Sequence, residues 1–194
     1  MNTKLNLASW VDSTEVEGPG NRFALWVQGC NIRCPGCCND QMFSLLPKRI
    51  VDTHEVVDMI AKSKKNNGIE GVTFLGGEPT LQARSLSIVA SEARELGLTV
   101  MMFSGFRLEE LLSQALPGVN QLLEYTDILI DGPFVAGRPE LKRNWVGSTN
   151  QRFHYLTDSY QPGIEFDRQY SPAVEFRIGP DSDIHMNGWP IDRI

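Results

Sequence analysis

The chain has few histidines, no excess of positive charge and no long apolar segment. Among its 194 residues only three are His, and 18 Lys and Arg stand against 24 Asp and Glu, for a net charge of −6. Nucleic acids and anionic membrane surfaces select basic proteins, so we expect neither as a partner. No stretch approaches the roughly 18 consecutive apolar residues of a membrane span, and we therefore expect no membrane association.

Cysteine is also scarce, and it is confined to one place. All four cysteines, Cys30, Cys34, Cys37 and Cys38, fall within nine positions. The first fifteen residues contain neither the continuous apolar stretch nor the small-residue cleavage site of a secretory signal, so we expect a cytoplasmic protein. In a reducing compartment, clustered thiols indicate metal binding rather than disulfides.

The length and the hydrophobic pattern predict one α/β domain. A complete eight-unit barrel usually takes about 250 residues, more than this chain provides, whereas an open or partial α/β sheet fits. Apolar runs typical of buried strands alternate with amphipathic helical patterns, which predicts a mainly parallel sheet whose ligands bind at the carboxyl ends of its strands. The predicted strands are 23–27, 72–75, 98–103 and 127–130. Three helices are predicted: the first starts after the capping-box residue Asp52 and ends at Asn67, and the others cover 84–96 and 108–116.

The last third of the chain has a different pattern. Residues 152–156 suggest a further strand, and 158–170 are polar and irregular. Apolar residues then alternate at Val174, Phe176 and Ile178 before a turn at 179–182. This alternation predicts a β-hairpin packed on the main sheet. We therefore divide the chain into a core, 1–158, and a C-terminal extension, 159–194, that is not an independent domain.

The cysteines form a C-x3-C-x2-C pattern over Cys30, Cys34 and Cys37. Three thiolates on one tight loop can hold three irons of a 4Fe-4S cluster and leave the fourth iron open, whereas a closed electron-transfer cluster uses four cysteines. Adjacent side chains diverge, so we expect Cys38 to be a bystander. The alternative is a structural zinc site that recruits Cys38 or His54, although zinc sites usually combine two cysteine pairs.

A second motif, Gly76-Gly77-Glu78-Pro79, directly follows a predicted buried strand. Glycines at such a position let the backbone approach a ligand closely, and Glu78 can accept hydrogen bonds from an ammonium group. On its own the motif is also compatible with a strand-to-helix turn that carries a solvated glutamate.

Taken together, the motifs resemble the radical S-adenosylmethionine superfamily. Within it, the chain is similar to the activating enzymes of glycyl-radical enzymes, and most similar to the activases of anaerobic ribonucleoside-triphosphate reductase. The resemblance covers roughly residues 16–158. It rests on Gly18-Pro19-Gly20-Asn21-Arg22, Gln28-Gly29-Cys30 through Cys37 with Asn39, Gly76 to Pro79, Ser104-Gly105-Phe106 before Leu108-Glu109-Glu110-Leu111, Asp131-Gly132-Pro133-Phe134, and Trp145 to Arg152.

The resemblance implies a fold, two cofactors and partners. The fold is a partial, open radical-SAM β/α barrel with a C-terminal β-hairpin extension. A 4Fe-4S cluster and S-adenosyl-L-methionine cooperate to generate a 5′-deoxyadenosyl radical, which takes a hydrogen atom from a glycine Cα of a partner glycyl-radical enzyme. The implied partner is the large subunit of anaerobic ribonucleotide reductase, and the implied electron donor is a flavodoxin or ferredoxin.

The resemblance also assigns site residues. Cys30, Cys34 and Cys37 bind the cluster, while Gly76, Gly77 and Glu78 bind the methionyl end of the cofactor. Asp131 lies near the cofactor carboxylate or a bound cation, with a simple Asp-Gly turn as the alternative. Ser104 contacts the ribose, unless it is a helix N-cap. No catalytic side chain is expected, because the cluster and the cofactor carry the chemistry.

Two other functions stay open at this stage. One is a radical enzyme that modifies a peptide or a small molecule, and the other is a non-catalytic iron-sulfur or zinc-binding module. The aromatic residue that often precedes the third cysteine in radical enzymes is replaced here by Gly36, and residues 159–194 carry no motif of the family.

Overall fold

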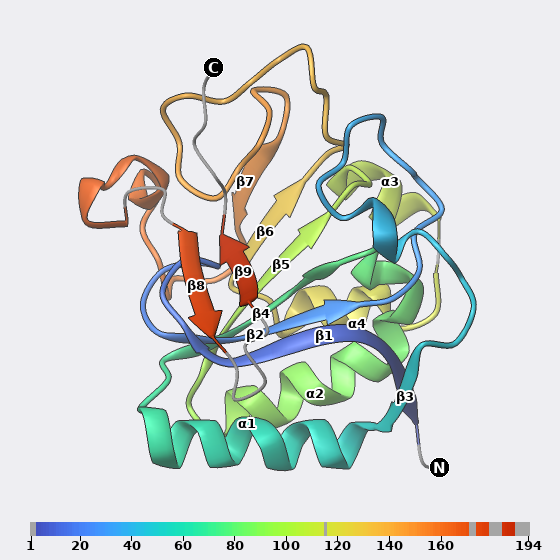
Figure 1. The fold of residues 1–194 in the computed structure, drawn as a ribbon, viewed down its shortest axis with the longest axis vertical. Helices are drawn as coiled ribbons and strands as arrows, with labels where there is room; N and C mark the ends of the chain where they lie inside the picture. Colours follow the sequence, from blue (N-terminus) through green and yellow to red (C-terminus); the bar gives the residue numbers. More distant parts are fainter. Residues whose placement is uncertain (1–2, 115, 171–173, 179–183, 189–194) are drawn as a thin grey trace.

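A computed structural model describes residues 3–114, 116–170, 174–178 and 184–188. Its central feature is a seven-stranded sheet in the order β3-β1-β2-β4-β5-β6-β7 (Figure 1). The middle strands are parallel to one another: β2 (Arg22–Val27), β4 (Gly71–Gly76), β5 (Thr99–Ser104) and β6 (Ile128–Asp131). The outer strands β1 (Lys4–Thr14), β3 (Arg49–Asp52) and β7 (Arg152–Tyr155) pair antiparallel. The predicted α/β class with a mainly parallel sheet is confirmed.

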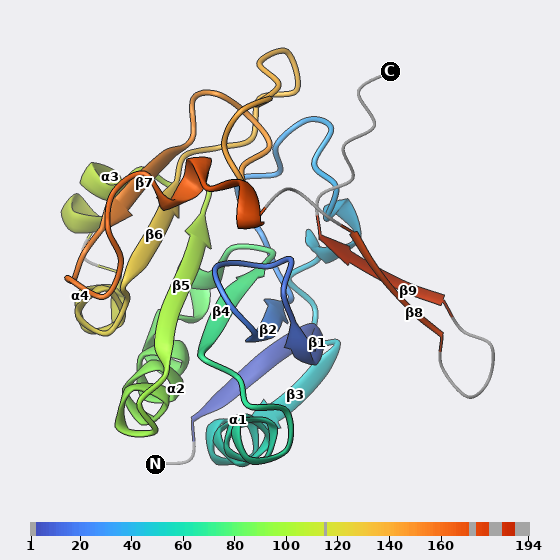
Figure 2. The ribbon, with the colours of Figure 1, turned by 90° about the vertical axis from the view of Figure 1, so that its left-hand side faces the viewer.

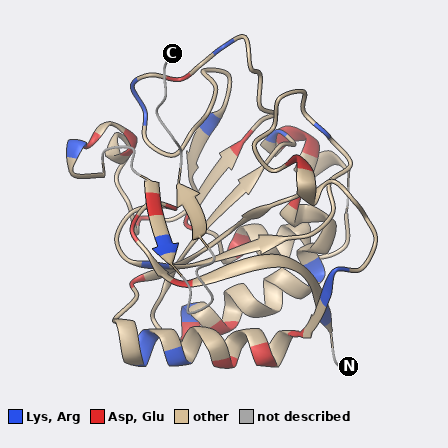
Figure 3. Cartoon of the chain, in the orientation of Figure 1, with Lys and Arg blue, Asp and Glu red and all other residues tan. Residues whose placement is uncertain are grey.

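Helices cover one face of this sheet. They are α1 (Thr53–Asn67), α2 (Ala83–Glu95), α3 (Leu108–Ser113) and α4 (Val119–Glu124), and Figure 2 shows α1, α2 and α4 on the side of the sheet opposite to the C-terminal hairpin. Side chains from alternate strand positions, such as Phe23, Leu25 and Phe74, pack with α1 and α2 in the main core. The exposed side of α1 carries both signs of charge (Figure 3).

The other face of the sheet is covered by loops. Here Ala24, Trp26 and Leu75 form a smaller apolar cluster with Met42, which belongs to the short helical turn η1 (Asp40–Met42). The central strands are therefore buried on both faces, as is usual for parallel strands. Their alternation sends one set of side chains to the helices and the other set to the loop-covered side.

Most of the predicted elements are confirmed. The α1 helix begins as expected, because the Asp52 carboxylate accepts a hydrogen bond from the His54 amide (3.0 Å). The predicted helix 108–116 is wrong in extent: α3 ends at Ser113, and α4 is a separate helix. Strands β1 and β3 were not expected. In β1 the polar residues Asn6, Ser9 and Asp12 interrupt the apolar pattern, and β3 has four residues directly before α1.

The predicted C-terminal hairpin is confirmed as β8 (Val174–Ile178) paired antiparallel with β9 (Ile184–Gly188). It forms a two-stranded sheet of its own and does not extend the main sheet. The predicted turn at 179–182 lies outside the described residues. Between β7 and the hairpin the chain forms the short turns η3 (Ile164–Phe166) and η4 (Arg168–Tyr170). Tyr160 accepts a hydrogen bond from the buried guanidinium of Arg22 (3.1 Å), which ties the start of the extension to β2.

Candidate functional site

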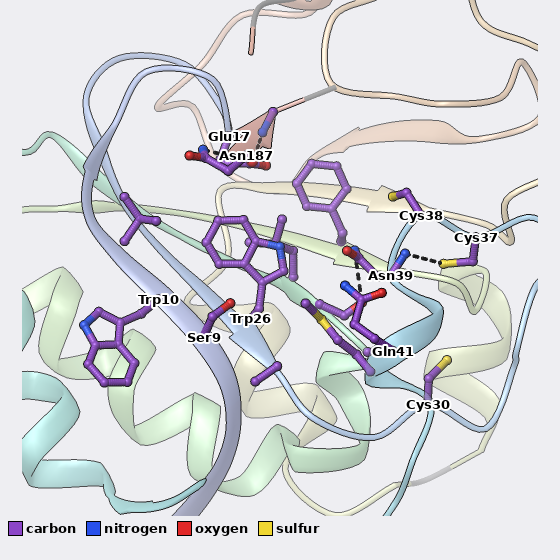
Figure 4. A pocket seen from close by; sticks show the side chains of 18 of the residues that line it. Ser9, Trp10, Glu17, Trp26, Cys30, Cys37, Cys38, Asn39, Gln41 and Asn187 are labelled. Carbon is purple, nitrogen blue, oxygen red and sulfur yellow. Dashed lines mark hydrogen bonds between the residues drawn. The ribbon is translucent and has the colours of Figure 1, made fainter. Parts of the chain in front are cut away.

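A cavity of about 1180 Å³ lies on the loop-covered side of the sheet, at the carboxyl ends of the parallel strands. Trp26, Leu75 and Phe103 contribute apolar surface to it. Figure 4 shows cysteines of the loop after β2 along one part of the cavity, and Glu17 with Asn187 at another. Within the described chain, the cavity is lined by Cys30, Cys34, Cys37, Cys38, Gly76, Gly77, Glu78, Ser104 and Gly105, among others. The topology thus brings the two principal sequence motifs to one place.

The cysteine loop is held in place by backbone hydrogen bonds at both ends of the motif. The Gly29 amide donates to the Met42 carbonyl (2.8 Å), and the Cys30 amide donates to the Phe43 carbonyl (3.4 Å). The Cys37 amide donates to the Cys34 carbonyl (3.2 Å), which closes a tight turn. Because this turn folds the loop back on itself, all three predicted ligands face the same cavity.

The local environment distinguishes the sulfur atoms. Burial raises the pKa of the Cys34 thiol. The Cys37 sulfur accepts hydrogen bonds from the Cys38 thiol and from the Asn39 amide (3.4 Å), and these lower the pKa of Cys37 to about 6. Cys38 lines the cavity and contacts Cys37, whereas the sequence argument places it apart as a bystander.

The donor set of the loop fits an iron-sulfur cluster. Thiolates are soft ligands that suit iron-sulfur clusters and zinc. His54, the nitrogen ligand of the alternative zinc site, belongs to the first turn of α1 and is not among the residues that line the cavity. In the part of the chain that the structure describes, no three His, Cys, Asp or Glu side chains are arranged to hold one metal ion.

Gly76, the last residue of β4, and Gly77, the residue after it, occupy positions where a larger residue would not fit. A Cβ atom on Gly77 would lie 2.2 Å from the Gly29 carbonyl oxygen, far inside contact distance. The Gly77 amide donates to the Val27 carbonyl (2.8 Å), and the Glu78 amide donates to the Gly29 carbonyl (2.8 Å). Gly76 has a φ of 109°, which disfavours any other residue. These glycines therefore join the Gly-Gly-Glu-Pro turn to the cysteine loop through the backbone.

Glu78 is buried beneath this turn and is richly hydrogen-bonded. One carboxylate oxygen accepts from the Thr80 amide (3.0 Å), the Thr80 hydroxyl (2.6 Å) and the Ser104 hydroxyl (2.9 Å). The other oxygen accepts from the Gly105 amide (2.8 Å). Burial raises the pKa of Glu78 even though these hydrogen bonds oppose the shift. Glu78 thus connects the ends of β4 and β5 at the wall of the cavity.

Ser104 is brought to the site, but it is not the N-cap of α3. The N-cap position belongs to Arg107, and the Ser104 oxygen instead accepts from the Phe106 amide (3.1 Å) while its hydroxyl donates to Glu78. The N-cap alternative for Ser104 is therefore wrong. The residue both lines the cavity and orients the Glu78 carboxylate.

Asp131 lies at the end of β6, but its side chain is not part of the cavity lining. Its carboxylate accepts from the Arg152 guanidinium (2.9 Å) and the Leu108 amide (2.7 Å), and the His154 ring lies 2.8 Å away. Burial by itself would raise the pKa of Asp131, but these partners hold it below its usual value. The buried Asp131 carboxylate thus joins β6, β7 and the start of α3.

Two parts of the cavity wall were not anticipated from the sequence. The first is β1, including Ser9 and Trp10, and the second is the C-terminal hairpin, through residues such as Arg177 and Asn187. Because polar residues interrupt the apolar pattern of β1, its sequence gave no clear signal for the first. Nothing local to the hairpin indicated that it would reach the cavity.

Comparison with known proteins gives a consistent result. Residues 16–154 match the model of a family described as a 4Fe-4S single cluster domain. The chain is 32% identical over 147 residues to the anaerobic ribonucleoside-triphosphate reductase-activating protein of Salmonella typhi, covering 73% of this chain and 92% of that protein. The chain belongs to this family of activating proteins.

Other members of the family are similarly related. The activating protein of Vibrio cholerae serotype O1 is 32% identical over 149 residues, with 73% of this chain and 92% of that protein covered. That of Enterobacteria phage T4 is 29% identical over 147 residues, which cover 74% of this chain and 89% of the phage protein. Among the described residues, no helix is long and apolar enough to cross a bilayer. The hairpin β8–β9 lies beyond residue 154, where the family match ends.

Proposed function

We propose that this activating-protein homologue is a radical S-adenosylmethionine activase. Cys30, Cys34 and Cys37 bind a 4Fe-4S cluster whose fourth iron has no protein ligand. When bound, the cluster and S-adenosylmethionine supply methionine and a 5′-deoxyadenosyl radical, which abstracts hydrogen from a glycine Cα of a partner enzyme. The observation that carries this proposal is that the three cysteines and the Gly-Gly-Glu-Pro turn line one cavity.

The chain's own residues prepare this cavity. The cysteine loop is fixed by the hydrogen bonds of Gly29 and Cys30, so the three thiols are held on one side before any ligand enters. Such preorganisation places bound groups next to each other without further ordering of the loop. The apolar residues Trp26, Leu75 and Phe103 limit the access of water, which favours hydrogen transfer within the cavity over side reactions.

We assign the methionyl end of the cofactor to the Gly76, Gly77 and Glu78 segment, with Ser104 beside it. Glu78 lines the cavity and its carboxyl group is oriented by four donors, so its oxygens are held in a fixed position from which they can accept a hydrogen bond from an ammonium group. Asp131 was predicted to contact the cofactor as well. Given its ion pair with Arg152 and its contact with the His154 ring, we now propose that Asp131 positions the loops at the carboxyl end of β6.

The finer description of the fold is part of the same proposal. Four parallel strands with helices on one face and a cavity on the other are what a partial, open radical-SAM barrel requires. We also propose the division into a core, 1–158, and an extension, 159–194. The end of the family match at 154 and the contacts of Tyr160 with the core support an extension that packs on the core.

We propose the large subunit of anaerobic ribonucleotide reductase as the partner, because the family members are named as its activating proteins. A flavodoxin or ferredoxin would supply the electron in the cytoplasm. Neither nucleic acid nor a membrane is proposed. In the view of Figure 3, acidic residues are interspersed with Lys and Arg along the chain, so that the basic residues form no continuous stripe in this view.

The test is anaerobic reconstitution of the cluster, reduction, and addition of S-adenosylmethionine with the reductase encoded in the same genome. The proposal expects cleavage of the cofactor and a glycyl radical on the reductase, detected by electron paramagnetic resonance. Cofactor cleavage with no radical on the reductase would favour a peptide or small-molecule substrate. Absence of any cleavage would reject the radical chemistry itself.

A further inference from the structure

The C-terminal hairpin has an unusual distribution of side chains. In the antiparallel pair, Phe176 lies opposite Met186 and Ile178 lies opposite Ile184, whereas Arg177 lies opposite His185 and Glu175 lies opposite Asn187. Residues that face each other across two strands share one side of the sheet. The hairpin therefore has an apolar face and a polar face. Figure 2 shows it standing away from the main sheet.

The polar face is turned toward the body of the protein. Asn187 donates to the Thr14 hydroxyl (3.0 Å), and Arg177 donates to the Ser13 carbonyl (2.7 Å). The Gly188 amide donates to the carboxylate of Glu17 (2.7 Å), a side chain that is itself buried. These bonds join both hairpin strands to the end of β1 and the turn that follows it. The orientation of the hairpin is thereby fixed.

The apolar face consequently points to solvent. The exposed fractions are 66% for Phe176, 77% for Ile178, 68% for Ile184 and 56% for Met186. In most half-exposed antiparallel sheets the apolar side faces the core and the polar side faces water. An apolar patch that is held outward by hydrogen bonds on its opposite face is typical of an interaction surface.

The position of the hairpin indicates what it would contact. Arg177, His185 and Asn187 line the same cavity as the cysteines, as does Met186 of the apolar face, so the hairpin forms part of the cavity wall. The hairpin also lies outside the region matched by the family model. It is therefore an addition to the matched region that contributes part of the cavity wall.

We propose that this apolar face, formed by Phe176, Ile178, Ile184 and Met186, is a docking surface for the protein whose glycine enters the cavity. The inference rests on the proposed function, since it takes the substrate to be a protein. The complementary surface on that partner is an apolar patch beside its glycine-bearing loop.

The size of the face favours this occupant over a second copy of the chain. Four side chains offer only a few hundred Å², whereas a standard protein interface takes about 800 Å² from each partner. The hairpin alone is too small for a stable dimer. A partner that inserts a loop into the cavity adds the rim and the cavity wall to the contact, and so reaches the required area.

The test compares full-length, cluster-loaded variants anaerobically. Phe176→Ser combined with Ile178→Ser removes the apolar face at two positions that do not line the cavity. Phe176→Leu keeps it apolar. Leu112→Ser, at an exposed leucine of α3, is the matched control for an apolar-to-polar change elsewhere. The Kd for the anaerobic ribonucleotide reductase of the same genome is measured by biolayer interferometry, and self-association by analytical ultracentrifugation.

We expect the Kd to rise at least about tenfold in the double variant and to stay at the wild-type value in Phe176→Leu and Leu112→Ser. Cleavage of S-adenosylmethionine without the reductase should be equal in all of them.

Unchanged affinity in the double variant would overturn the docking surface. A loss of self-association alone would also overturn it, because that result assigns the face to a second copy of the chain. A wild-type protein that cleaves the cofactor but does not bind the reductase also overturns it. A wild-type protein that cleaves no cofactor overturns the proposed function instead.

Discussion

At the scale of single residues, the cysteine loop contains the three proposed cluster ligands and also Cys38, a neighbouring cysteine that is not a proposed ligand. Cys37 and Cys38 are neighbours in the chain, line the same cavity and touch each other through their sulfur side chains. Only Cys37 belongs to the C-x3-C-x2-C pattern. The two residues therefore separate ligation of the cluster from mere proximity to it.

We predict that Cys37→Ala loses most of the bound iron and sulfide after anaerobic reconstitution, because a cluster with two protein thiolates is poorly held. Cys30→Ala and Cys34→Ala should behave in the same way. Cys38→Ala should retain an iron content close to that of the wild type, measured by colorimetric iron and sulfide assays. An equal loss of iron in Cys38→Ala would contradict the assignment of ligands.

Glu17 offers a second test at this scale, on stability. Burial raises the pKa of Glu17 from 4.5 to about 7; the Gly188 amide and Asn187 oppose this shift, Glu175 adds to it and Arg177 reduces it. The folded protein therefore retains a proton that the unfolded chain releases above pH 4.5. The stability associated with this proton is complete below about pH 4.5 and is lost as the pH rises through 7.

Glu17→Gln should accordingly match the wild type at pH 4.5 and exceed its free energy of unfolding at pH 8 by at most about 3 kcal/mol. The amide oxygen of glutamine can still accept from Gly188. Denaturant unfolding at the two pH values measures the difference. Glu15→Gln, at an exposed position nearby, is the control variant for the loss of a carboxylate in this turn. A Glu17→Gln variant that is less stable than the wild type at pH 8 would show that the ionised carboxylate is needed.

At the scale of elements, the turns after β2 and β4 depend on each other. Gly77→Ala places a methyl group against the Gly29 carbonyl, and backbone on both sides leaves little room for relaxation. We predict a loss of about 1–3 kcal/mol in the free energy of unfolding, typical of overpacking. Gly137→Ala, where a Cβ meets nothing within 4 Å, is the control and should be nearly neutral. Equal effects of the two changes would contradict the close contact between the turns.

The elements also mark what can be read from the sequence. The α1 helix was predictable because its signals are local: the Asp52 cap and an apolar stripe that includes Val56 and Ile60. The β1 strand was not, because it pairs antiparallel with β2 on one side and β3 on the other, and this pairing depends on segments distant in the sequence. Strand existence in such cases is decided by tertiary pairing rather than by the pattern of one segment.

At the scale of the whole molecule, the same distinction applies to the site. The cysteines and the Gly-Gly-Glu-Pro turn could be placed together because parallel strands bring their carboxyl ends to one edge. The side of the sheet to which the Asp131 side chain points could not be predicted, because all residues of β6 are buried and the strand has no alternating pattern. The structure shows Leu129, two positions earlier on β6, in the core that packs on the helices, so Asp131 shares that side and faces Arg152 and His154.

The most direct test of the central claim is the electron paramagnetic resonance spectrum of the reduced, reconstituted protein before and after addition of S-adenosylmethionine. If one iron of a cluster held by Cys30, Cys34 and Cys37 is open to the cofactor, the spectrum of a reduced 4Fe-4S cluster should change when the cofactor is added. A cluster spectrum that the cofactor leaves unaltered, or a protein that takes up zinc in place of iron, would contradict the account.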